Sequence, residues 1–147
     1  MTTPALLMAL NEAKALAARG EPVPEAVTDL VLRILTQASD TPAVLEALSG
    51  ASAGRALLRI TDGTRAIEFQ AGDRTLSAAV ADPKGKGPKV DATAATWLGL
   101  LGGTLKPWLA FTRGLVICRA GITELRWLQQ TAERLQRGYE DARTTAQ

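Results

Sequence analysis

The first fifty residues carry apolar side chains at helical spacing. Apolar positions recur three and four residues apart along residues 24–38, which predicts an amphipathic helix. Its stripe comprises Val27, Leu30, Val31, Ile34, Leu35 and Ala38. Thr3-Pro4 and Gly20 predict the start and the end of an earlier helix, and residues 42–50 predict a shorter third one. Because each helix must bury its apolar side, we expect a helical layer that covers one face of a sheet.

Further along the chain the period of the apolar positions changes to two. The alternation predicts strands at residues 56–60, 67–70, 76–80 and 90–94. Asp62-Gly63 is a strong signal for a hairpin turn, and Gly72-Asp73 marks a second turn. The Gly- and Lys-rich stretch at 82–88 lacks the spacing of a phosphate-binding loop and predicts a surface turn. Strands preceded and followed by helices indicate an α+β fold.

Residues 93–128 are dense in large apolar side chains but are repeatedly broken by Gly and Pro. The pair Gly102-Gly103 ends one apolar helix, Pro107 begins a second short helix that ends at Gly114, and four apolar residues from Leu115 predict a buried strand. Short helices around a strand can leave an apolar cavity between layers, as ligand sites often do. On the residue pattern alone, plain core packing is the favoured explanation of the same residues.

The order of these residues is more specific than their composition. An apolar helix ends in a turn at Leu100–Pro107, Ala110-Phe111 follows in a short helix, and Gly114 precedes a strand. This pattern resembles the signature of the sterol carrier protein, or non-specific lipid-transfer protein, domain family. The resemblance extends from about Arg55 into the final helix. The chain departs from the family at Lys106 (usually Asn), at Ala120 (commonly Gly), and at Leu115 and Ile117 (often Lys).

The length of 147 residues predicts one domain over residues 1–147. The apolar pattern places an N-terminal helical region at 1–50, which the resemblance does not reach before about Val44, and the resemblance implies the sheet and ligand-covering helices at 53–137. The implied fold is α+β, with N-terminal helices and a five-stranded antiparallel or mixed sheet that helices cover on one face, enclosing an apolar cavity. The implied function is non-catalytic binding or carriage of a fatty acyl chain, acyl thioester, sterol or isoprenoid. The alternative is a non-enzymatic accessory subunit whose apolar groove binds a partner protein.

The predicted ligand site combines apolar residues of the two short helices, the last strand and the final helix. These residues are Trp97, Leu98, Leu101, Leu105, Trp108, Leu109, Phe111, Val116, Cys118, Leu125 and Leu128. Four further residues form the sheet side of the predicted cavity: Leu58, Ile67, Phe69 and Val80. Trp108 follows Pro107 at a helix start, and we expect its amphipathic ring at the mouth of the site.

Composition narrows the function classes further. The chain has no histidine, which excludes Ser-His and Cys-His nucleophilic sites and His-ligated metals, and its acids at Asp62, Asp73 and Asp82 lie in turns. We therefore expect neither catalysis nor a cofactor or metal. The single cysteine, Cys118, lies in an apolar strand and predicts a buried, inert thiol. No apolar run approaches about 20 residues and no secretory signal is present, so we expect a cytoplasmic protein without stable membrane insertion.

The distribution of charge and the alternation of side chains along the last predicted strand indicate which macromolecules the chain could bind. Residues 1–54 carry a net charge of −3 and residues 55–147 a net charge of +5, but the cations are interleaved with acids. With few aromatic residues beside them, these cations predict no nucleic-acid binding. If Val116 and Cys118 face the cavity, Leu115 and Ile117 face the opposite way at a sheet edge. That outward apolar pair predicts cover by the N-terminal helices or by a second copy in a homodimer.

Overall fold

Three of the helices begin at prolines. The computed structural model of the protein describes residues 5–20 and 22–146, so the predicted helix start at Thr3-Pro4 lies outside the described residues. Pro24, Pro42 and Pro107 each begin a helix, as expected of a residue that lacks a backbone donor. The helices are α1 (Ala5–Arg19), α2 (Pro24–Ala38), α3 (Pro42–Ala47), α4 (Ala94–Gly102), α5 (Pro107–Thr112) and α6 (Ile122–Ala146).

Five strands form one mixed sheet, which confirms the predicted fold class. The strands are β1 (Gly54–Ile60), β2 (Ala66–Gly72), β3 (Thr75–Ala81), β4 (Lys89–Ala92) and β5 (Ile117–Arg119). Their order is β3-β2-β1-β4-β5. Strands β1 and β4 pair in parallel, and the other neighbours are antiparallel. The loop at 82–88 carries the chain from the β3 edge back to β4, which the parallel pairing requires.

Two predicted strand boundaries are wrong for local reasons. The fourth strand ends at Ala92 instead of Ala94, because the Thr93 side chain caps α4 by accepting a hydrogen bond from the Thr96 amide at 3.3 Å. The last strand starts at Ile117 instead of Leu115. The amides of Leu115 and Val116 donate to the Ala110 carbonyl, which keeps both residues in the turn after α5.

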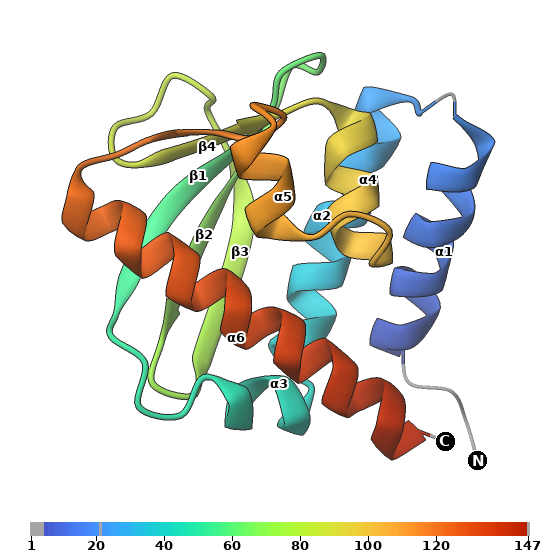
Figure 1. Cartoon of the computed structure of the whole chain (residues 1–147), viewed down its shortest axis with the longest axis vertical. Coiled ribbons are helices and arrows are strands. Elements are labelled where there is room, and N and C mark those ends of the chain that lie inside the picture. Colours follow the sequence, from blue (N-terminus) through green and yellow to red (C-terminus); the bar gives the residue numbers. More distant parts are fainter. Residues whose placement is uncertain (1–4, 21, 147) are drawn as a thin grey trace.

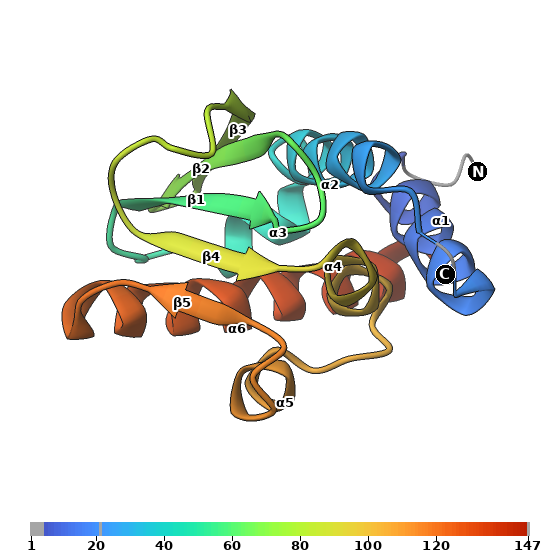
Figure 2. The ribbon, with the colours of Figure 1, turned by 90° about the horizontal axis from the view of Figure 1, so that it is seen from above.

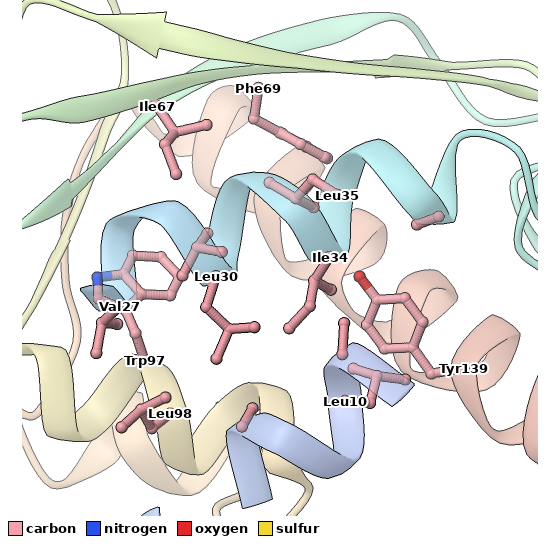
Figure 3. Packing of buried hydrophobic residues seen from close by; sticks show 14 of the residues in the cluster. Leu10, Val27, Leu30, Ile34, Leu35, Ile67, Phe69, Trp97, Leu98 and Tyr139 are labelled. Carbon is pink, nitrogen blue, oxygen red and sulfur yellow. The ribbon is translucent and has the colours of Figure 1, made fainter. Parts of the chain in front are cut away.

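The core lies between one face of the sheet and the helices. Helix α2 packs on β2 and β3, while α1 packs on α2 and α4 and lies farther from the sheet (Figure 1). The long helix α6 crosses β1 and contacts α3. Its Trp127 ring lies against Phe69 with 6.1 Å between ring centroids. Figure 3 shows Leu10, Ile34, Leu98 and Ile67, which are fully buried and come from α1, α2, α4 and β2.

Candidate functional site

A row of apolar residues crosses the sheet on the face that carries the helices. The strand register aligns Ile67, Leu58, Val90 and Cys118, and paired neighbours point to the same face. Ile67 and Val90 are buried, whereas Leu58 and Cys118 are only partly buried. The helical layer therefore leaves this apolar row incompletely covered at Leu58 on the central strand β1 and at Cys118 on the edge strand β5.

Helices α4, α5 and α6, the turns between them and strand β5 supply the other predicted ligand residues. Trp97, Leu98 and Val116 are buried, and the Trp97 indole donates to the Arg59 carbonyl at 3.1 Å. A second group is only partly buried: Leu101, Leu105, Leu109, Cys118, Leu125 and Leu128. Several of them, including Leu101, Leu105 and Leu128, pack against the core. The structure thus leaves six of the predicted residues partly accessible, and their assembly into one ligand site stays a prediction.

Two of the predicted ligand residues lie on the molecular surface. Trp108 is 63% exposed and Phe111 is 47% exposed. They are three residues apart and so share one side of α5, whereas the neighbouring Ala110 is fully buried. Val80 is also exposed, to 49%, because it lies on the edge strand β3. Val80 pairs with Ile67 and so points to the face of the sheet that carries the helices, and its place on the sheet side of a cavity stays a prediction.

The cavity itself is not shown by the described residues. A hollow of about 220 Å³ lies against β1 and the 82–88 loop. Its lining mixes charged and apolar residues, among them Arg55, Leu57, Glu68 and Lys86. Because Arg55 and Leu57 alternate with Leu58, they point to the opposite face of the sheet. No pattern in the sequence indicates this hollow.

The opposite face of the sheet also holds an ion-pair cluster. Asp91 on β4 is 5% exposed and accepts two hydrogen bonds from Arg59, each 2.5 Å long, and one of 2.9 Å from Arg119. The Arg59 hydrogen bonds hold the pKa of the Asp91 carboxyl below its usual value; burial opposes this shift and Arg119 adds to it. The carboxylate is thus fully partnered, which suits a structural link across β1, β4 and β5 better than a catalytic base. Arg59 and Asp91 are 32 residues apart, so no local signal reveals the pair.

Cys118 is a protonated thiol in this environment. Burial raises its pKa above the usual value, and the nearby Asp91 charge adds to the shift. A thiol is a much weaker nucleophile than a thiolate, so the residue is suited to apolar packing. Within the described ranges, no group of three or more Cys, Asp or Glu side chains could hold a metal ion. In the same part of the chain, no helix is both long enough and apolar enough to cross a membrane.

Comparison with known proteins shows similarity in structure only. No protein-family model matches the sequence, and no curated protein matches it. A crystal structure of sterol carrier protein 2 matches with a TM-score of 0.56 at 22% identity, over 77% of this chain and 93% of that one. A conserved hypothetical protein from Thermus Thermophilus matches with a TM-score of 0.55 at 23% identity, over 83% of this chain and 90% of that one.

A third match is part of an enzyme. The stereoselective inverting sec-alkylsulfatase Pisa1 from Pseudomonas sp. matches with a TM-score of 0.52 at 17% identity. The match covers 73% of this chain but only 16% of the enzyme, so the similar part is a small fraction of that protein. At these identities the matches establish the fold.

Proposed function

We propose that this chain, which has the fold of sterol carrier protein 2, is a non-catalytic carrier that binds an apolar ligand between its sheet and helices α5 and α6. The ligand class is a fatty acyl chain, acyl thioester, sterol or isoprenoid. One observation carries the proposal: apolar side chains that face the helical layer are left partly uncovered. Leu58 and Cys118 lie on the sheet, and Leu109 and Leu125 lie on the helices.

Helix α5 is the element that a ligand would displace. It has six residues and lies between Gly103 and Gly114, whose φ angles of 80° and 73° are left-handed. Only Ala110 of this helix is fully buried. An outward shift of α5 would therefore break few contacts of buried side chains, and in this proposal it makes room for the ligand.

Burial of the ligand supplies the binding energy. Removing one methylene group from water yields about 0.8 kcal/mol, so ten groups yield about 8 kcal/mol before ordering costs, which corresponds to about micromolar affinity. This mechanism needs no acid, base or metal. It fits a chain without histidine whose one buried carboxylate, among the described residues, is held by two arginines.

A second candidate is an accessory subunit that binds a partner protein through the same region. The exposed rings of Trp108 and Phe111 favour it, because aromatic side chains are enriched at protein interfaces. The two functions differ in what is bound. A carrier binds and retains a small lipid, whereas an accessory subunit binds a partner protein and needs no lipid.

Ligand binding can be tested with a fluorescent fatty-acid analogue. We expect stoichiometric binding, displacement by unlabelled lipid, and slower reaction of Cys118 with an aromatic disulfide reagent when the site is filled. Leu109→Glu should weaken binding at least about tenfold, because a charge would have to be buried beside the ligand. Met8→Glu, at an exposed position on α1, is the matched control and should bind as the wild type does.

The result that would exclude a carrier is equally specific. If fatty acids, acyl thioesters, sterols and isoprenoids all fail to bind, and native mass spectrometry of the protein purified from cells shows no retained lipid, the partner-binding function replaces it. Far-UV circular dichroism of Leu109→Glu must match the wild type, so that loss of binding is not loss of fold.

A further inference from the structure

Exposed apolar side chains are concentrated in one short part of the chain. Of the eight large apolar residues that are exposed in the described ranges, five lie between residues 108 and 122. They are Trp108 (63%), Phe111 (47%), Leu115 (43%), Ile117 (50%) and Ile122 (80%). Single exposed apolar residues are ordinary, whereas several that lie close together favour an interaction site.

The elements that carry these residues lie on one side of the molecule. Helix α5, strand β5 and the first turns of α6 face the viewer in Figure 1 and line the lower side in Figure 2. Strand β5 is at the edge of the sheet, and α5 lies beyond it. Leu115 lies in the turn between α5 and β5, and we refer to it and the other four exposed residues as the α5–α6 surface.

The charges around the α5–α6 surface have one predominant sign. Residues 106–126 contain four cations, Lys106, Arg113, Arg119 and Arg126, and one acid, Glu124, for a net charge of +3. All four cations are exposed. The Glu124 carboxylate accepts a hydrogen bond from the Gly121 amide at 3.2 Å, so it is directed at the start of α6. Within the described part of the chain, Lys106, Arg113 and Arg126 form no ion pair.

We propose that the α5–α6 surface docks this protein reversibly onto an anionic lipid bilayer. Aromatic and aliphatic side chains would enter the headgroup boundary, where the amphipathic Trp108 ring is favoured. The flanking lysine and arginines would lie near the lipid phosphates, each strengthening attachment about fivefold. Peripheral contact of this kind needs no membrane-spanning helix.

Charge also favours an anionic bilayer over a second copy of the chain as the partner of this surface. In a symmetric dimer the same surface meets itself, so the cations of one copy would face the cations of the other. An anionic bilayer complements the +3 charge instead. The homodimer expected from Leu115 and Ile117 is therefore the competing outcome, and the bilayer is the partner that the charge favours.

The docking surface goes beyond the proposed carrier function and does not rest on it, because it depends only on exposure and charge. Flotation of lipid-free protein with vesicles tests it. We expect binding to vesicles of equal parts phosphatidylcholine and phosphatidylserine, weak binding to phosphatidylcholine alone, and loss of binding as salt is raised. Ile117→Ser/Ile122→Ser should reduce binding at least about tenfold. Lys106→Gln/Arg113→Gln should reduce it by about fivefold per cation removed.

Matched controls change similar residues elsewhere. Met8→Ser/Val23→Ser removes two exposed apolar side chains of the N-terminal region, and Lys84→Gln/Lys86→Gln removes two exposed cations of the loop at 82–88. Both should bind vesicles as the wild type does. Ile117 and Ile122 lie outside the proposed ligand site, so their double variant should still bind the fatty-acid analogue. Failure of docking is thereby distinguished from failure of ligand binding.

Three outcomes would overturn the proposal. The first is a wild-type protein that does not float with the anionic vesicles. The second is vesicle binding that the Ile117→Ser/Ile122→Ser variant retains in full. The third is a dimer in light scattering that the same variant converts to a monomer, which would assign the α5–α6 surface to a second copy.

Discussion

At the scale of single residues, Asp91 is the residue whose structural role is least evident from the sequence. Its carboxylate is nearly inaccessible and receives hydrogen bonds from Arg59 on β1 and Arg119 on β5. Removing one partner of a buried pair leaves the other charge without compensation, whereas an exposed ion pair contributes little. Loss of the Asp91 carboxylate should therefore destabilise the fold far more than loss of Arg119, whose side chain is 62% exposed.

We predict that Asp91→Asn lowers the free energy of unfolding by about 2 kcal/mol near pH 7, and that Arg119→Gln lowers it by less than about 1 kcal/mol. The folded-state pKa of Asp91 is lowered, so its contribution is complete above the unfolded pKa of about 3.9 and is lost as the pH falls through the folded pKa. The difference between wild type and Asp91→Asn should accordingly shrink on acidification.

Urea denaturation at neutral pH and near pH 3 measures both effects. Equal destabilisation by Asp91→Asn and Arg119→Gln would show that the carboxylate is not the central partner. A difference between wild type and Asp91→Asn that does not shrink at low pH would show that the ionised form contributes nothing.

At the scale of elements, two glycines permit close contact between helices. A Cβ at Gly102 would lie 2.8 Å from the Cα of Lys14 on α1, and a Cβ at Gly138 would lie 2.9 Å from the Cα of Val44 on α3. The sequence pattern predicts only that Gly102 and Gly103 together end a helix. The structure separates their roles: Gly103 adopts the left-handed conformation that ends α4, and Gly102 lets α4 approach α1.

We predict that Gly102→Ala lowers the free energy of unfolding by about 2 kcal/mol, because the added methyl group meets the α1 backbone and forces the two helices apart. Gly121→Ala is the control, since its Cβ would meet only the flexible Glu124 carboxylate, at 3.0 Å. Thermal unfolding followed by circular dichroism compares them. If Gly102→Ala is as stable as Gly121→Ala, α1 and α4 can move apart without loss of stability, and their close approach does not contribute to the free energy of unfolding.

The elements themselves follow largely from local patterns. The stripe from Val27 to Ala38 forms α2, and the hairpin signal at Asp62-Gly63 separates β1 from β2. The parallel pairing of β1 with β4 and the buried Asp91 cluster are set by contacts distant in sequence, which a local pattern does not contain. For the candidate site, periodicity finds the apolar residues but does not report what covers them. It therefore does not distinguish the exposed Phe111 from a cavity residue.

At the scale of the whole molecule, the N-terminal helices and the sheet share one core. Leu6, Leu10 and Ala13 of α1 are almost completely inaccessible, and their helix packs on α2 and α4. In turn α2 packs on β2 and β3. Figure 3 shows Leu10 and Ile34 in the same cluster as Ile67 and Phe69 of the sheet. The helical region at 1–50 and the region at 53–137 should therefore unfold together.

We predict that Leu10→Ala destabilises the entire chain by about 3 kcal/mol, because it removes a side chain that is 0% exposed. Tryptophan emission tests this directly, since Trp97, Trp108 and Trp127 all lie in the later region and none lies on α1. Urea unfolding followed by emission and by far-UV circular dichroism should give one coincident transition, shifted equally in both signals. Met8→Ala, 61% exposed on the same helix, should shift neither. An emission midpoint that stays in place while the dichroism signal falls earlier would show that the N-terminal helices unfold as a separate unit.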